Sequence, residues 1–326
     1  MGDTMDWSTR VTDLLGCKYP IIQGAFGGFG RSDIAAPVSE AGGFGIITAT
    51  SFKTPDDLRK DIRNARSMTG SPFGVNLSLI GHPRIDGFRE VAIEERVAGV
   101  FTSAYKAEEH GRRIKEAGIP WIHKVGTLKH ALVAERQGAD AIVMVGIEGE
   151  GEKSPVHLST LTSVVLACRA LEIPVIAAGG IGDGRSFLAA LAMGAEGVYM
   201  GTAFMATREC PIAEKYKQGL IDADPYAPEL RNKVFAPPPP GLDELTREQK
   251  VYDLVGDAKP HSESEPMPVM SGSMAVGMIT EVVPVEEMIR RIIREAEELL
   301  TGDSPLGRIL AAQAAEYEAT TLAEEV

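Results

Sequence analysis

Cysteine is scarce in this sequence. Only Cys17, Cys168 and Cys210 occur in 326 residues, and they are far apart in the chain. An odd number of distant cysteines with no CxxC pair argues against a disulfide framework and against a zinc site, and is typical of free thiols in a reducing compartment. We therefore predict no metal centre and a cytoplasmic location.

Long apolar runs and an excess of positive charge are also missing. No run of about 18 apolar residues occurs, so we expect no transmembrane helix. The first ten residues, MGDTMDWSTR, contain no apolar signal-peptide core. The chain has 33 Lys and Arg against 46 Asp and Glu, a net charge of −13, which argues against nucleic acid or an anionic membrane as a partner. Backbone amides remain able to bind an anion locally.

Short apolar segments, in contrast, recur along most of the chain. Each is rich in β-branched residues or almost continuously apolar, which is typical of strands buried on both faces. The eight segments are 20–25, 44–50, 73–79, 97–104, 119–125, 141–147, 174–180 and 197–204.

Amphipathic stretches with helix-end signals separate these segments. Thr54 and Pro55 suit the first positions of a helix, and Gly118 and Gly138 suit the residue just after one. Eight strand–helix units in succession predict an α/β fold of the (β/α)₈ TIM-barrel type. A doubly wound sheet is the alternative, and it usually has fewer repeated units.

The repeating pattern ends near residue 212. We predict a barrel formed by residues 1–212 and 268–300, a Pro-rich insertion or lid at 213–267, and a C-terminal helix with an acidic tail at 301–326. The stretch VEEMIRRIIREAEELL carries an apolar stripe that would allow a homodimer.

Glycines follow the last two predicted strands. Gly179 and Gly180 precede a helix, and Gly201 and Thr202 follow the eighth strand. Backbone amides at such turns bind phosphate, and TIM barrels often bind phosphate after strands 7 and 8. Tight turns alone would explain each motif separately, but their occurrence on adjacent strands favours a phosphate site.

Several longer motifs together resemble the nitronate monooxygenase family, formerly called 2-nitropropane dioxygenase. The resemblance covers roughly residues 8–212 and 270–300, and is strongest toward the NADH:quinone reductase branch, with IHK, ATRECP and SGSMAVGMI as the branch-like segments. It implies a TIM barrel with a smaller inserted helical segment, and FMN as the cofactor.

The resemblance also implies roles for individual residues. Gln23 and Gly24 would lie against the flavin ring, with the Ala25 backbone near its reactive N5 edge. Asn76 would hydrogen-bond the flavin or its ribityl chain, with a buried amide that satisfies the strand ends as the alternative. Lys124 would place a cation near the N1–C2=O edge, with a lysine extending to solvent at the barrel rim as the alternative.

The remaining residues implied to bind the cofactor follow the later strands. They are Glu148, Gly149, Gly151, Ala178, Gly179, Gly180, Gly201, Thr202 and Ser271, with Ser273 in the same late motif. His123 alternates with Lys124 along its strand, so we expect it to face the other way and to be packed rather than catalytic.

One position departs from the family pattern. The family loop after strand 6 usually reads EAGGH, and its histidine is the catalytic base, whereas this chain has Glu148 to Glu152 as EGEGE. Glu152 therefore occupies the histidine position. A solvated charge run is the simpler reading for Glu150, and for Glu152 both readings stay open.

These observations favour an enzyme that needs no histidine base. The leading expectation is an FMN-dependent oxidoreductase that transfers a hydride from NADH or NADPH through flavin N5 to a quinone or another small electrophilic acceptor. The alternatives are a nitronate monooxygenase that uses O₂, an FMN-dependent enoyl-thioester reductase, and a barrel that binds flavin or nucleotide without catalysis.

Overall fold

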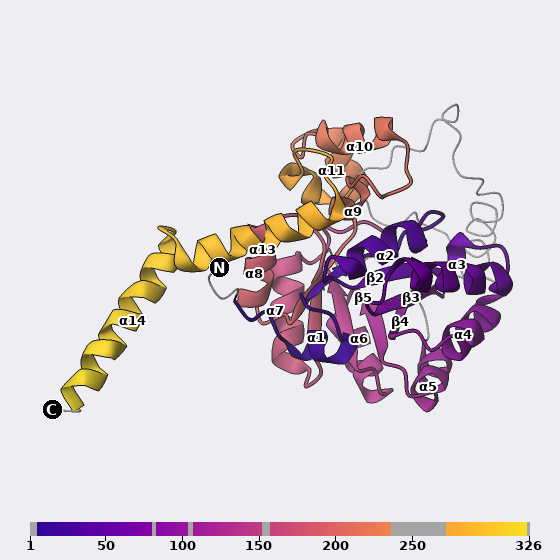
Figure 1. Ribbon diagram of the computed structural model, residues 1–326, viewed down its shortest axis with the longest axis horizontal. Coiled ribbons are helices and arrows are strands. Elements are labelled where there is room, and N and C mark those ends of the chain that lie inside the picture. Colours follow the sequence, from indigo (N-terminus) through magenta and orange to yellow (C-terminus); the bar gives the residue numbers. More distant parts are fainter. Residues whose placement is uncertain (1–4, 80–82, 104–106, 152–156, 236–271, 325–326) are drawn as a thin grey trace.

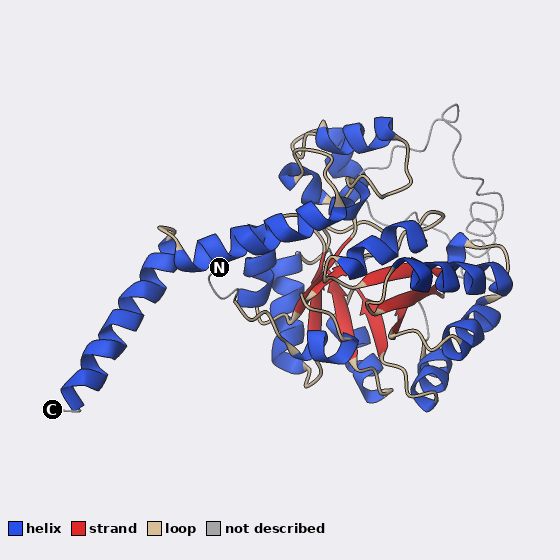
Figure 2. Cartoon of the chain, in the orientation of Figure 1, coloured by secondary structure: helices blue, strands red, loops and turns tan. Residues whose placement is uncertain are grey.

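A parallel eight-stranded sheet forms the centre of the molecule, and helices surround it (Figures 1 and 2). The computed structural model describes residues 5–79, 83–103, 107–151, 157–235 and 272–324. The strands are β1 (Ile21–Gln23), β2 (Gly45–Thr48), β3 (Phe73–Ser78), β4 (Gly99–Ser103), β5 (Trp121–Val125), β6 (Ala141–Val145), β7 (Val175–Ala178) and β8 (Gly197–Met200).

Helices follow the strands in turn, as the sequence predicts. They are α2 (Ser32–Glu40), α3 (Pro55–Met68), α4 (Ile85–Glu94), α5 (Glu108–Glu116), α6 (Leu128–Arg136), α7 (Thr160–Ala170) and α8 (Gly184–Ala192), with η1 (Ala49–Ser51) before α3 and α1 (Arg10–Leu15) before β1. Thr54 caps α3 by accepting a hydrogen bond from the Asp57 amide at 3.2 Å. Gly118 and Gly138 have φ of 72° and 93°, as expected for residues that end helices.

The sheet closes into a barrel between β1 and β2. Its hydrogen-bonded order is β1-β8-β7-β6-β5-β4-β3-β2, and an isolated bridge between Ile22 and Phe44 joins the two ends. The Gln23 amide donates to the Phe44 carbonyl at 3.0 Å, and the Ile46 amide donates to the Gln23 side-chain oxygen at 2.9 Å. The (β/α)₈ prediction is therefore confirmed, and a glutamine side chain supplements the short closing contact.

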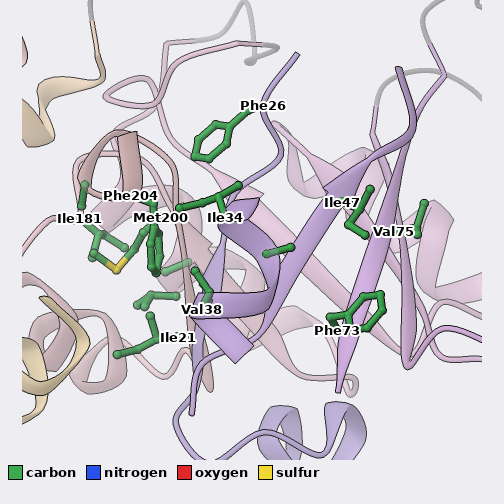
Figure 3. Packing of buried hydrophobic residues seen from close by; sticks show 14 of the residues in the cluster. Ile21, Phe26, Ile34, Val38, Ile47, Phe73, Val75, Ile181, Met200 and Phe204 are labelled. Carbon is green, nitrogen blue, oxygen red and sulfur yellow. The ribbon is translucent and has the colours of Figure 1, made fainter. Parts of the chain in front are cut away.

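Two apolar cores stabilise the barrel. One fills its interior and includes Ile22, Phe44, Phe101, Ile122 and Tyr199, with residues of α1 packed against it. The other lies between the strands and the helices, and Figure 3 shows part of it around β1, β2 and β3. Seven of the strands contribute side chains to both cores, and β3 contributes Phe73, Val75 and Leu77 to the outer one, so most strand sequences are almost continuously apolar.

The predicted eighth strand is too long, since residues 202–204 belong to a short helix. Gly201 turns into the helical region (φ −98°, ψ −70°), and α9 (Thr202–Met205) begins directly after it. The following helices are α10 (Glu214–Ile221) and α11 (Pro228–Phe235), and the chain returns with η2 (Met274–Met278). The Pro-rich lid predicted within 213–267 lies mostly outside the described residues.

The helix with the predicted interface stripe packs within its own chain. In α13 (Val285–Thr301), Met288, Ile289, Ile292 and Ile293 are buried, and α13 lies on α8. The stripe is therefore not an exposed dimer surface. Helix α14 (Pro305–Glu324) follows and leads away from the barrel (Figure 1). Among the described helices, none combines the length and apolarity needed to cross a membrane.

Replacing Gly111 by alanine is expected to destabilise the fold. A Cβ at this position in α5 would lie 2.4 Å from Cζ3 of Trp121, whose ring is fully buried. Overpacking of this kind costs about 1–3 kcal/mol, which exceeds the gain of about 0.5–1 kcal/mol from removing a helical glycine. Urea unfolding measures the difference.

Gly219→Ala in α10 is the matched control, because its Cβ would have no neighbour within 4 Å. It should be neutral or slightly stabilising. Equal unfolding midpoints for both variants would show that the Trp121 ring yields without cost.

Candidate active site

A cavity of about 600 Å³ opens at the carboxyl ends of the strands. This volume lies within the range of about 300–1,000 Å³ that is typical of small-molecule sites. All eight strands, or the loops that follow them, contribute residues to its lining. Within the described part of the chain, the lining includes Gly24, Ala25, Phe26, Phe29, Asn76, Ser78, Ser103, Lys124, Gly149, Gly151, Ala178, Gly179, Gly180, Tyr199, Gly201, Thr202 and Ser273.

The glycine cradle, defined as Gly179, Gly180, Gly201 and Thr202, forms one side of the cavity. Gly179 and Gly180 both have positive φ, 104° and 70°, so their successive amides turn in a way that most residues rarely adopt. Among the described residues, the four amides donate to no protein group. Unpaired amides at glycine turns and at a helix start are donors that suit an anion such as a phosphate.

Ser273 returns the late part of the chain to this cradle. Its amide donates to the Thr202 hydroxyl at 2.9 Å, and the two hydroxyls are 2.9 Å apart. A Cβ on Gly272 would lie 2.2 Å from Cγ2 of Thr202, so the two segments approach as closely as a glycine allows. Ser271, predicted for the same motif, lies outside the described residues.

Glu148 holds the loop after β6 and does not line the cavity. Its carboxylate accepts from the amide and hydroxyl of Thr160 at 2.7 and 2.8 Å, and its carbonyl accepts from Met274 at 3.0 Å. It therefore satisfies the first amide of α7. Glu148 thus positions the loop beside Gly179 and Gly180, and its predicted contact with the cofactor stays a prediction.

The end of β1 reaches the cavity through backbone rather than side chain. Gly24 and Ala25 line it, while the Gln23 side chain is fully buried in the contact with β2. The Ala25 amide donates to the Tyr199 hydroxyl at 2.7 Å, and a Cβ on Gly24 would lie 3.1 Å from the same ring. Burial raises the pKa of Tyr199, so this phenol stays protonated.

Polar side chains line the ends of β3, β4 and β5. The Asn76 side-chain amide donates to the Phe101 carbonyl at 3.3 Å, which leaves its oxygen facing no described donor. Lys124 extends toward the loop after β6, since its Nζ lies 4.0 Å from a Cβ built on Gly151. The structure therefore brings Asn76 and Lys124 into the same cavity as the glycine cradle.

No histidine lines the cavity within the described residues. Gly149, Glu150 and Gly151 line the cavity, and the Glu150 side chain is exposed. Glu152 lies outside the described residues. His157 is exposed and does not line the cavity.

His123 is packed away from the cavity, as predicted from its alternation with Lys124. Its Nδ1 lies 2.7 Å from the Thr102 hydroxyl, and the side chain is buried. Burial lowers the pKa of His123 from 6.5 to about 4. The ring is therefore neutral near pH 7 and serves packing.

The depressed pKa of His123 predicts acid sensitivity. The unfolded chain binds a proton near pH 6.5 and the folded chain only near pH 4, so this contribution is complete above pH 6.5 and is lost as pH falls toward 4. Between pH 7 and pH 5 the loss is about 2 kcal/mol. Unfolding of His123→Gln should show that much less pH dependence, whereas the exposed His157→Gln should match the parent chain. Identical pH profiles for both variants would contradict the assignment.

Sequence reasoning missed several residues of the cavity. Phe26 and Phe29 stack with centroids 4.9 Å apart and an interplanar angle of 15°. Tyr199, Ser78 and Ser103 also line the site. Position at a strand end was an available signal for the two serines, but the stacking of two loop aromatics depends on the loop conformation.

The site combines unpaired amides at glycine turns, two stacked aromatic rings and a lysine at the strand ends of an α/β barrel, where the small-molecule sites of such barrels lie. Comparison with known proteins identifies the family. The family model described as nitronate monooxygenase matches residues 8–235. The chain therefore belongs to the nitronate monooxygenase family.

Three relatives illustrate the range of this similarity. A probable nitronate monooxygenase of Staphylococcus saprophyticus is 30% identical over 76% of this chain and 82% of its own length. The structure of FabK from Thermotoga maritima superposes with a TM-score of 0.76 and 34% identity, covering 90% of this chain and 97% of that one.

The third relative is by name a dehydrogenase of a carboxyl-CoA compound, which is a thioester. The (3aS,4S,5R,7aS)-5-hydroxy-7a-methyl-1-oxo-octahydro-1H-indene-4-carboxyl-CoA dehydrogenase of Rhodococcus jostii is 36% identical over 65% of this chain. The match spans 59% of that relative's length.

Proposed function

We propose that the protein binds FMN and uses NADH or NADPH to reduce a small acceptor whose double bond is conjugated to a carbonyl, with a quinone as the leading candidate. The observation that carries this proposal is the pairing of a phosphate cradle with a cavity that has a lysine but no histidine among its described lining residues. Hydride transfer needs orientation and charge stabilisation, whereas removal of a carbon-bound proton needs a base.

The residues present fit FMN. The glycine cradle offers four unpaired amides to one phosphate, and its positive-φ glycines pack closely against the loop after β6. A Cβ on Gly201 would have Phe26 as its nearest neighbour, at 3.8 Å, so this side faces open space. When bound, FMN supplies the hydride-accepting and hydride-donating chemistry that no side chain here offers.

The chain's own residues then have distinct tasks. Gly24 and Ala25 let backbone approach the ring system without a bulky side chain, and Phe26 and Phe29 exclude water from one side. Asn76 offers a buried amide oxygen. Lys124 supplies the positive charge that favours the negatively charged reduced cofactor.

An enoyl thioester is the second candidate acceptor. The Rhodococcus relative is by name a carboxyl-CoA dehydrogenase, so a thioester is within the chemistry associated with similar chains. A quinone and an enoyl thioester share a carbonyl conjugated to the carbon that receives hydride, and one site geometry serves both.

Anaerobic flavin reduction is the decisive experiment. The purified protein should be yellow, should release FMN on denaturation, and should bleach when mixed with NADH or NADPH. Menadione or crotonyl-CoA should then restore the colour. Bleaching by propionate-3-nitronate but not by either nicotinamide would favour the monooxygenase, and a colourless protein that takes up no FMN would favour neither.

Glu152→Gln tests the missing histidine directly. Because hydride transfer requires no base, we expect nicotinamide-dependent turnover within about twofold of the parent, whereas loss of a general base costs on the order of 10²–10⁴-fold. Stopped-flow flavin reduction measures this. A loss in that larger range would assign Glu152 the role of the family histidine.

A further inference from the structure

Two serines at adjacent strand ends have no task in the proposed cofactor site. Ser78 ends β3 and Ser103 ends β4, and the two residues are paired in register. Both line the cavity. We propose that this serine pair, defined as Ser78 and Ser103, binds the carbonyl oxygen of the acceptor and thereby selects conjugated carbonyl compounds; the inference rests on the proposed reductase function.

The serine hydroxyls are available to a ligand. The Ser103 carbonyl accepts from the Leu79 amide at 2.9 Å, so the backbone of this strand end is held in place. Within the described residues, neither serine hydroxyl bonds to a protein group. Each hydroxyl is therefore a donor that turns toward the cavity at little cost.

The serine pair lies in a different layer from Asn76. Asn76 and Ser78 share one face of β3, and two residues of strand separate them by roughly 7 Å. Asn76 is 2% exposed, whereas both serines are partly exposed at the cavity mouth. The deeper layer suits the bound cofactor, and the outer layer suits a molecule that enters and leaves.

The serine pair is also remote from the phosphate cradle. In the barrel order, β4 lies four strands from β8, so Ser103 is across the mouth from Gly201. Ser103 is in register with Lys124 on β5 as well as with Ser78. Two hydroxyls beside a lysine form a set of donors for an oxygen that gains negative charge.

A conjugated carbonyl is the acceptor chemistry that uses such donors. Hydride from the reduced cofactor forms a C–H bond at the far carbon of the double bond, and the displaced π electrons move to the carbonyl oxygen. A proton from solvent then restores neutrality, so the acceptor gains one hydride and one proton. Donors at the carbonyl oxygen stabilise that charge as it forms.

The test is equilibrium binding to the oxidised, FMN-loaded enzyme, which holds no electrons to give. Calorimetry with menadione and with crotonyl-CoA should show a roughly 10- to 100-fold weaker Kd in the Ser78→Ala/Ser103→Ala double variant, as expected for two lost hydrogen bonds. The FMN spectrum and FMN affinity should be unchanged. Ser103→Thr, which keeps a hydroxyl, should recover part of the affinity, and the exposed Ser67→Ala on α3 should match the parent.

Failure of the inference is distinguishable from failure of the proposed function. Unchanged Kd values for both carbonyl ligands, or loss of FMN from the double variant, would overturn the role of the serine pair. Ferricyanide, which has no carbonyl, should reoxidise chemically reduced parent and double variant at equal rates. Absence of reduction by NADH and NADPH would overturn the proposed function and leave the binding result standing on its own.

Discussion

Gly179→Ala is expected to lose tight FMN binding, with a Kd roughly 100-fold weaker, as for one or two charge-assisted hydrogen bonds worth about 1.5–3 kcal/mol each. Gly179 has φ of 104°, and its Cβ would lie 2.9 Å from the Gly149 amide nitrogen and 2.9 Å from the Thr160 hydroxyl. The methyl group would therefore push apart the loops after β6 and β7 and tilt the cradle amides. Fluorescence titration of the apoprotein with FMN measures the change.

Gly138→Ala is the matched control for backbone strain. Gly138 has φ of 93° and no neighbour within 4 Å of a built Cβ, and it follows α6 rather than the cavity strands. It should lose stability of about 1–2 kcal/mol from the left-handed backbone while retaining FMN affinity. If Gly179→Ala bound FMN as tightly as Gly138→Ala does, the cradle would not be the phosphate site.

Lys124→Met is expected to retain FMN but to slow its reduction by NADH or NADPH by about 10²–10³-fold, the usual cost of removing one preorganised electrostatic stabiliser. The lysine lies in the cavity near Gly151, and the methionine keeps its length without its charge. The midpoint potential of the bound flavin should fall as well, because the reduced form loses a favourable charge. Stopped-flow absorbance and a dye-coupled titration measure the two effects.

Two further variants separate charge from position. Lys129→Met removes an exposed lysine from the neighbouring α6 and should leave both measurements unchanged. Lys124→Arg keeps the charge and should recover part of the potential even where its larger head group slows the reaction. A normal potential in Lys124→Met would refute the charge role and favour a lysine that merely lines the rim.

The local pattern of apolar and polar residues was sufficient to predict the strands and helices and their order along the chain. Apolar segments long enough for one strand, each followed by an amphipathic helix, admit few architectures, and eight repeats match a barrel. The ends were less accurate: the predicted segment 197–204 includes α9, because Gly201 turns the chain into a helix as soon as β8 leaves the barrel. The strand propensity of the residues YMGTAF does not predict that turn.

The sequence pattern did not predict which surface or group each of these residues contacts. The stripe of α13 was visible in the sequence, but a stripe does not specify which surface covers it, and α8 of the same chain does so. The resemblance assigns Glu148 and Gln23 to the cofactor site, and the structure adds that their side chains bond to Thr160 and to the Ile46 amide. In both cases a backbone amide from a distant segment competes for the polar group.

The sequence by itself determined the barrel, the glycine turns after β7 and β8 and the packing of His123, because strand alternation and turn chemistry are local properties. Only the tertiary structure decided that β1 and β2 close through Gln23, that Phe26 stacks on Phe29, and that Ser78 and Ser103 meet at the mouth. Those contacts join residues far apart in the chain, so their geometry depends on strand register and loop conformation, which no local pattern encodes.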